Sequence, residues 1–156
     1  VWVADVGTDR DCIVMMSAVL AGTRKVKVGS AVLPIWPHNP VSLATIWSTM
    51  YDLAPGRPIL GLGAWFEPLA SKVGVKRVKP LRAMREYTEA IRSLFSRQEI
   101  SYQGEFVNID GIQVLGPSGC WCDDGFVSVH TTDNKINLKS GSCWQGNGGA
   151  AGIIKS

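Results

Sequence analysis

Two consecutive strand–loop–helix units most constrain what this chain can fold into. Val26–Pro40 has the sequence VKVGSAVLPIWPHNP, and Gly56–Ala70 has the sequence GRPILGLGAWFEPLA. Each begins as an apolar strand and passes through a loop rich in Gly and Pro into a helix. Strands that alternate with helices predict a parallel sheet with crossover helices, and thus an α/β fold. In such folds the loops after the strands carry the chemistry, so the ends of these two strands are the predicted site.

The predicted order is strand then helix, three times, followed by a hairpin. The predicted strands are Val1–Asp5, Val26–Val32 and Ile59–Gly63. The first predicted helix runs from about Arg10 to Ala21 behind a Thr8 or Asp9 cap, and the second runs from Pro40 to about Leu53 behind Asn39. After a helical turn near residues 67–72, the third helix begins at Pro80 with the apolar stripe Leu81, Met84, Tyr87, Ile91, Leu94 and Phe95. The predicted hairpin covers Ile100–Tyr102 and Phe106–Ile109.

Composition narrows the classes of function. The chain has 156 residues, of which 46% are hydrophobic and 19% charged, as in one soluble globular domain. Its net charge of +3 is too small to favour nucleic acid as a partner. The basic run Lys72–Arg82 has no interleaved aromatic residues, so we interpret it as the solvated start of a helix. No segment reaches the about 18 apolar residues of a membrane span, and no signal peptide is present, so we expect a cytoplasmic location and no membrane partner.

The sequence changes character beyond Leu115. Residues 116–156 are rich in Gly, Ser, Asn, Cys and Trp without a sustained period, which predicts an irregular, loosely packed tail, either native or non-native sequence from a shifted reading frame. Conceivable zinc ligands in this tail are Cys120, Cys122, Cys143 and His130. Their C-x-C pair is not the C-x2-C knuckle that zinc sites favour, so we predict no metal site. Cys12 lies in an apolar helical run and is predicted to be a buried thiol.

Residues that could bind a ligand gather at the three strand ends. They are Asp5, Gly29, Ser30, Ala31, Val32, Gly63, Ala64 and Trp65. Small residues at a strand end let the backbone approach a flat ligand closely, although they equally suit tight packing of a helix over a strand. Asp5 could accept a hydrogen bond from a ligand, or could instead close a turn before Gly7. The G-x-G at Gly61–Gly63 lacks the third glycine of the dinucleotide-binding fingerprint.

Catalytic residues are unknown at this level, and two side chains are candidates for acid–base work. His38 precedes the second predicted helix, where a loop histidine is usually a solvated side chain and less often one that binds a ligand. Glu67 follows the third strand and could orient a substrate, or could favour the start of a short helix. No Ser/His/Asp nucleophile set and no phosphate-binding loop motif is present.

Taken together, these segments resemble the bacterial-luciferase-like flavin and deazaflavin oxidoreductases. The likeness is greatest to the methylenetetrahydromethanopterin-reductase-like branch, which uses coenzyme F-420. The matching segments are VWVAD at Val1–Asp5, Asp9–Val32, His38–Trp65, Lys79–Leu94 and Tyr102–Ile112. The most specific of them are the strand with GSAV at residues 29–32 and the LAPGRPILGLGAW block at residues 53–65.

The resemblance implies a (β/α)8 barrel with the cofactor ring at the mouth formed by the strand ends. It also implies a non-prolyl cis peptide behind the ring. The family pattern places this bond in the segment Ser30–Val32, and within that segment it favours the bond between Ala31 and Val32. A barrel of this type needs about 250 residues, so the chain is predicted to be a fragment. Residues 1–115 would hold the second to fourth barrel strands with their helices and then the hairpin. The family commonly has His after the strand-end Asp, where this chain has Val6.

The function implied by the resemblance is that of a fragment of a coenzyme F-420- or FMN-dependent oxidoreductase or monooxygenase acting on a small-molecule substrate. Because the family's phosphate-binding loops lie in strands that the predicted fragment lacks, we expect the isolated chain to be inactive. The alternative is a non-catalytic binding or assembly subunit. Open sheet edges would let such a chain form homo-oligomers or pair with another chain.

Overall fold

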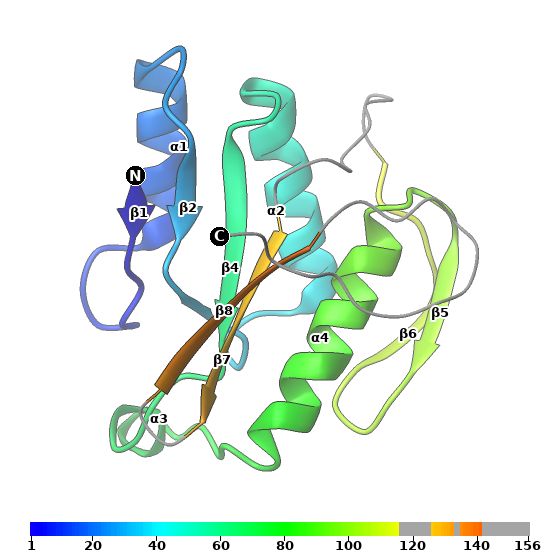
Figure 1. Cartoon of the computed structure of the whole chain (residues 1–156). Coiled ribbons are helices and arrows are strands. Elements are labelled where there is room, and N and C mark those ends of the chain that lie inside the picture. The colour runs from blue at the N-terminus through cyan, green and yellow to red at the C-terminus, as the bar shows by residue number, and fades with distance from the viewer. Residues whose placement is uncertain (116–125, 133–134, 142–156) are drawn as a thin grey trace.

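The structure is a computed structural model, and it describes residues 1–115, 126–132 and 135–141, with side chains described up to residue 115. Its elements alternate as predicted up to the hairpin (Figure 1). The strands are β1 (Trp2–Val3), β2 (Val28–Ser30), β3 (Leu33–Pro34), β4 (Pro58–Gly63), β5 (Ile100–Gln103), β6 (Asn108–Ile112), β7 (Phe126–Thr132) and β8 (Lys135–Gly141). The helices are α1 (Cys12–Gly22), α2 (Pro40–Leu53), α3 (Leu69–Lys72) and α4 (Pro80–Leu94).

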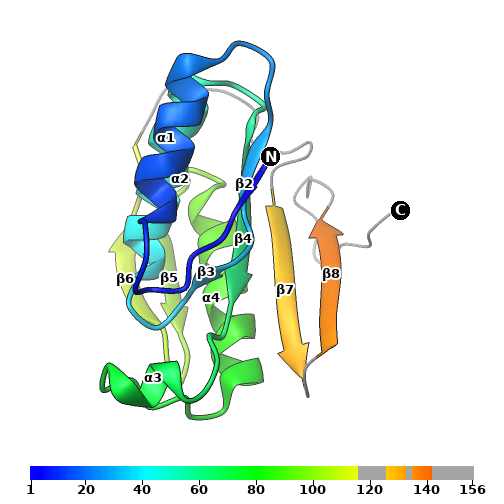
Figure 2. The same cartoon turned by 90° about the vertical axis from the view of Figure 1, so that its left-hand side faces the viewer.

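One twisted sheet organises these elements. Its strand order is β1-β2-β4-β7-β8, and β3 pairs with the far part of β4. The pairs β1–β2, β2–β4, β3–β4 and β4–β7 are parallel, whereas β8 returns antiparallel to β7. Helices α1, α2 and α4 lie together on one side of the sheet (Figure 2). The predicted parallel α/β architecture is therefore confirmed.

A single apolar core fills the space between the sheet and these helices. Its largest fully buried side chains include Trp47 of α2, Met16 of α1 and Leu60 and Leu62 of β4. The pattern matches a parallel strand that is buried on both faces and is therefore apolar along its length. Within the described part of the chain, no helix is long and apolar enough to cross a membrane.

Local signals set the helix boundaries. The second helix begins and ends as predicted: the Asn39 side chain accepts a hydrogen bond from the Val41 N–H at 2.8 Å, and Pro40 occupies the first turn. The start predicted for the first helix is wrong, because Asp11 and not Thr8 or Asp9 is its cap. The Asp11 carboxylate accepts from the Val14 N–H at 2.9 Å.

Three further expectations need correction. Of the strand predicted over Val26–Val32, only Val28–Ser30 forms a strand, β2; after a bend at residues 31–32 the chain pairs again as β3. Leu81, placed on the apolar stripe of the third helix, is 50% exposed, whereas Ala83 and Glu86 are buried. The tail predicted to be irregular contains β7 and β8, whose sequences FVSVHTT and KINLKSG both have apolar residues at alternate positions, as is typical of strands.

The predicted hairpin is present and lies against α4. Strands β5 and β6 pair antiparallel, with Tyr102 opposite Ile109 and Gln103 opposite Asn108. Glu86 of α4 is 5% exposed, and its carboxylate accepts hydrogen bonds from three successive backbone N–H groups at the hairpin turn, those of Glu105, Phe106 and Val107. This carboxylate therefore anchors the hairpin to the helix.

Candidate functional site

The predicted site lies in a cleft at the carboxyl ends of β1, β3 and β4, which we call the strand-end cleft. Its volume is about 1020 Å³. It is lined by Ala4, Asp5, Val6, Ala31, Val32, Pro34, Gly63, Ala64, Trp65, Phe66, Glu67, Arg77, Lys79, Pro80, Leu81 and Arg82. Ligands of parallel α/β folds bind at this edge, where the loops after neighbouring strands converge.

Small residues form the floor of the strand-end cleft. Ala31 is exposed and Val32 half-buried directly after β2, and the peptide between them is cis, as the resemblance implied. Gly63 ends β4 beside them, and a Cβ at Gly63 would collide with the Val32 side chain. The glycine therefore lets β4 pack directly against Val32. The resulting floor presents little side-chain bulk to a ligand.

Two of the predicted cofactor residues lie below this floor and do not line the cleft. Ser30 is fully buried, and its hydroxyl both donates to the Gly61 carbonyl and accepts from the Gly61 N–H, each at 2.9 Å. Gly29 is buried beneath the ring of Trp2, where a Cβ would collide with the indole. Ser30 thus joins β2 to β4, and Gly29 makes room for the packing of β1.

Trp65 forms one wall of the strand-end cleft. Its backbone has a φ of 61°, in the left-handed region that few bulky residues adopt. Its indole Nε1 donates to the Val6 carbonyl at 3.3 Å, and the ring covers Gly7, where a Cβ would collide with it. The wall therefore connects the loop after β4 to the loop after β1.

The carbonyl of Ala64 fixes the base of this wall. It accepts hydrogen bonds from Trp36 Nε1 and from Arg77 Nε, both at 2.8 Å. Each donor comes from a different loop, so one carbonyl ties three segments together. Sequence reasoning missed Trp36 and Arg77, because the basic run that contains Arg77 was interpreted as a solvated helix start.

Asp5 lines the strand-end cleft and closes a local turn. Its Oδ1 accepts from the Gly7 N–H at 2.8 Å, which is the turn-forming role weighed against ligand binding. Together with burial, the Asp5 carboxylate raises the pKa of the buried Cys12 thiol to about 12. Cys12 is therefore a protonated core thiol, and the prediction that it is buried is confirmed.

The two candidates for acid–base chemistry separate in the structure. His38 does not line the strand-end cleft. Burial lowers the pKa of His38, although the negative charges of Asp5 and Asp11 act in the opposite direction, so the imidazole is neutral at pH 7. Glu67 lines the cleft, but its Oε2 accepts from the Ser71 hydroxyl at 2.6 Å and the Ser71 N–H at 3.2 Å. These bonds hold the pKa of Glu67 below its ordinary value. Glu67 thus resembles a capping residue more than a catalytic acid.

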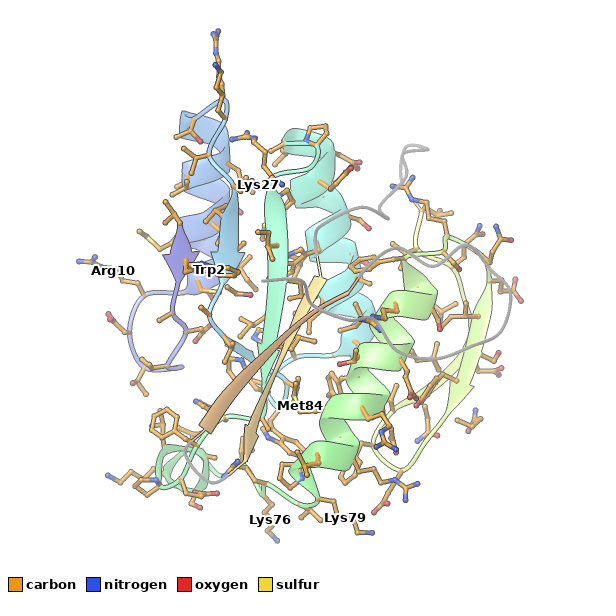
Figure 3. All side chains as sticks on the ribbon, viewed as in Figure 1. Trp2, Arg10, Lys27, Lys76, Lys79 and Met84 are labelled. Atoms are coloured by element: carbon orange, nitrogen blue, oxygen red, sulfur yellow. The ribbon has the colours of Figure 1, made fainter. Side chains whose placement is uncertain are left out.

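A second cleft of about 700 Å³ lies at the opposite end of the sheet. We call it the opposite cleft; its lining includes Ala21, Lys27 and Arg57, and Figure 3 shows Lys27 and Lys79 at opposite ends of the sheet. Arg57 donates to the Leu20 carbonyl at 2.7 Å. Its guanidinium therefore caps the carbonyl end of α1, which is a structural role.

No cluster of three or more His, Cys, Asp or Glu side chains suited to a metal ion occurs among the described residues. The zinc ligands considered above fall outside them, because the structure describes no side chain beyond residue 115. The zinc hypothesis for Cys120, Cys122, Cys143 and His130 is therefore not tested by this geometry.

The part of the chain that forms this cleft matches a known family in sequence. Residues 1–119 match the sequence model of the luciferase-like monooxygenases. The chain belongs to the luciferase-like monooxygenase family. The match covers the sheet up to β4, the hairpin and every residue of the strand-end cleft. The resemblance seen in the sequence is thus confirmed.

Reductases and dehydrogenases are among the curated relatives of this luciferase-like chain. The 5,10-methylenetetrahydromethanopterin reductase of Archaeoglobus fulgidus is 29% identical over 113 residues, which are 72% of this chain and 34% of the relative. The F420-dependent glucose-6-phosphate dehydrogenase of Kineococcus radiotolerans is 33% identical over 101 residues, which are 62% of this chain and 30% of the relative. The chain therefore spans about a third of the length of these relatives.

Solved structures place the luciferase-like chain in a known fold. The coenzyme F420-dependent tetrahydromethanopterin reductase of Methanopyrus kandleri superposes with a TM-score of 0.67 at 21% identity, over 73% of this chain and 37% of that one. A type II Baeyer–Villiger monooxygenase of Pseudomonas putida in complex with FMN gives 0.61 at 18% identity, over 69% and 32%. The fold is part of a (β/α)8 barrel, as predicted.

Proposed function

We propose that the strand-end cleft binds the tricyclic ring of coenzyme F420, with FMN as the alternative, and that the chain forms one side of an oxidoreductase active site. The observation that carries the proposal is the floor of small residues at the ends of adjacent parallel strands. The cleft volume of about 1020 Å³ suits a ligand of this size. Relatives named for F420 and a similar structure with FMN support the same two cofactors.

Each part of the cleft has a role in this proposal. Ala31, Val32 and Gly63 would lie against one face of the ring and exclude water from it. Trp65 would close the side of the cleft, and Asp5 would accept a hydrogen bond from a ligand N–H or O–H group. A bound ring of this kind supplies hydride transfer to or from an organic substrate. The protein contributes the position of that ring and the dryness of its surroundings.

A matched pair of substitutions tests the proposal. Ala31→Leu fills the floor of the strand-end cleft, whereas Ala21→Leu adds the same volume to the opposite cleft. Titration of F420 and FMN, followed by absorbance and fluorescence, should give saturable binding to the native chain. Ala31→Leu should weaken that binding at least tenfold, and Ala21→Leu should leave it unchanged.

The same titration separates the rival proposal. If neither ring compound binds while size-exclusion chromatography shows a stable oligomer, the non-catalytic assembly role is favoured. Equal losses from Ala31→Leu and Ala21→Leu would place the ring elsewhere. The cytoplasmic location, the absence of a nucleic-acid partner and a boundary between two domains near residue 115 stay predictions.

A further inference from the structure

The charges around the strand-end cleft are unequally paired. Its lining contains two carboxylates, those of Asp5 and Glu67, and three cations, those of Arg77, Lys79 and Arg82. The cations lie on the segment that leads into α4 and in the first turn of that helix, so they form one side of the cleft. A cation that lines a cleft is available to a ligand only when no neighbouring carboxylate already neutralises it.

Two of these cations form ion pairs with carboxylates of the protein. Lys79 Nζ lies 2.8 Å from Glu105 Oε1. Arg82 Nε lies 3.0 Å from Glu86 Oε1 and 3.2 Å from Glu105 Oε2. These contacts hold α4 to the hairpin turn. Each of these two cations thus already has a carboxylate partner beside which a ligand oxyanion would have to bind.

Arg77 differs from both. Its side chain is half-buried, and its Nε donates to the Ala64 carbonyl at 2.8 Å. Among residues 1–115, no carboxylate lies within ion-pair distance of its guanidinium, and Nε makes the only hydrogen bond of that group. The anchored Nε restricts the rotation of the side chain. The two terminal nitrogens keep four N–H donors in the planar fork that suits a carboxylate or a phosphate.

The backbone around Arg77 favours an anion at the same place. Helix α4 begins at Pro80, three residues further on, and the first residues of this helix also line the strand-end cleft. A helix N-terminus carries a partial positive charge, which adds to that of the guanidinium. Of the carboxylates in the cleft, Glu67 lies near enough for the charge of Arg77 to contribute to lowering its pKa, after the hydrogen bonds from Ser71, but it does not form an ion pair with Arg77.

We propose that Arg77 binds an oxyanion, a carboxylate or a phosphate, of the ligand that occupies the strand-end cleft. The inference rests on the proposed function, because it assumes a ligand in this cleft. The oxyanion belongs either to the side chain of the ring cofactor or to the substrate beside it. In either case Arg77 determines specificity: it selects anionic ligands over neutral ones of the same shape.

Paired ring compounds test this assignment. FMN differs from riboflavin by a phosphate, and F420 differs from its deazaflavin chromophore by a phosphate-linked acidic side chain. If the oxyanion belongs to the cofactor, the native chain should bind the anionic member of each pair at least tenfold more tightly. Arg77→Gln should reduce that preference to less than twofold, and Arg77→Lys should restore part of it.

The control variant is Lys76→Gln. It removes the same charge one residue away, from an exposed side chain that does not line the strand-end cleft and that extends outward in Figure 3. Lys76→Gln should keep the full preference for the anionic compounds. An equal loss in Lys76→Gln and Arg77→Gln would overturn the proposal, because a general field effect would then explain it.

A second arm covers an oxyanion of the substrate. Inorganic phosphate is titrated into riboflavin-loaded protein, and saturable quenching that is present in the native chain but absent in Arg77→Gln supports the proposal. If no ring compound binds, the proposed function fails. The role of Arg77 is then tested in the unloaded chain, by whether phosphate quenches tryptophan fluorescence in the native chain but not in Arg77→Gln. Urea denaturation first establishes that Arg77→Gln is folded. The proposal is overturned if this folded variant keeps both the preference for anionic compounds and the response to phosphate. Should Arg77→Gln not fold, Arg77→Lys with unchanged affinities for every compound, phosphate included, overturns it equally.

Discussion

Replacing Glu86 by Gln should be among the most destabilising single-atom changes in this chain. Each carboxylate oxygen of Glu86 accepts two hydrogen bonds. Oε1 accepts from Arg82 Nε at 3.0 Å and from the Glu105 N–H at 3.2 Å. Oε2 accepts from the Phe106 N–H at 2.7 Å and from the Val107 N–H at 3.2 Å. An amide must place its NH2 against one of these pairs of donors, in either orientation.

The size of the effect follows from the pKa of this carboxyl. Burial by itself would raise the pKa of Glu86, but the hydrogen bonds from the Phe106, Glu105 and Val107 N–H groups and from Arg82 outweigh burial and lower it from 4.5 to about 2. That difference corresponds to about 3 kcal/mol of folding free energy. Glu86→Gln should therefore lower the free energy of unfolding by about 2–4 kcal/mol at pH 7.

The sign of the pH dependence follows from the same numbers. Because the folded-state pKa lies below the unfolded one, the folded state binds fewer protons. The stabilisation from Glu86 is thus complete above about pH 4.5 and is lost as the pH falls toward 2. Urea denaturation between pH 7 and pH 2 should show this loss in the native chain. The component due to Glu86 should be missing in Glu86→Gln.

Glu105→Gln is the matched control. Glu105 belongs to the same hairpin and pairs with Lys79 and Arg82, but its side chain is 35% exposed. Its removal should cost less than about 1 kcal/mol, because solvent screens exposed ion pairs. Equal losses for the two variants would refute the reasoning. An identical slope of stability against pH in Glu86→Gln and the native chain would refute it too.

Two further predictions concern packing and burial. Gly61→Ala should destabilise the chain by about 1–3 kcal/mol, because the added Cβ would collide with the Ser30 carbonyl. Gly22→Ala, which has open space at the end of α1, should be neutral or stabilising by up to about 1 kcal/mol. Urea denaturation measures both variants, and equal effects would contradict the packing described. Cys12 should resist alkylation by iodoacetamide at pH 8 until the chain is unfolded, because burial raises the pKa of its thiol to about 12. Peptide mapping by mass spectrometry measures the modification, and modified Cys12 in the folded chain would contradict this prediction.

The sequence predicted best where a local signal and a tertiary requirement coincide. The Asn39–Pro40 pair defines the start of α2, because a side-chain cap and a residue without an N–H both suit a helix N-terminus. The alternation of strands and helices similarly predicted the parallel sheet. The start of α1 was predicted wrongly because Thr8, Asp9 and Asp11 all have side chains that can cap, and only the folded chain selects Asp11.

The sequence predicted only some of the residues that form the floor of the site. Ala31 and Val32 were predicted to back a ligand, and both line the strand-end cleft. Ser30 was assigned to the same surface, but its hydroxyl is directed to Gly61, 31 residues away. Nothing in the spacing of residues indicates that pairing, because it depends on the register between β2 and β4.

Arg77 and Glu86 show a second limit of sequence reasoning. Both belong to polar segments in which charges are usually solvated, so a periodic pattern gives no reason to single them out. Their roles come from partners distant in sequence: the Ala64 carbonyl for Arg77, and the turn at residues 105–107 for Glu86. A charged residue acquires a specific role here only when burial removes the competing water.

These contacts also decide what a binding experiment on this chain can test. The floor of the strand-end cleft is held by the bonds between Ser30 and Gly61, and its wall by the Ala64 carbonyl and by the bond from Trp65 to Val6. All these partners lie within residues 1–115. The surface proposed to face the ring is therefore positioned by contacts that the chain itself contains. A failure of Ala31→Leu to affect ring binding would then count against that surface.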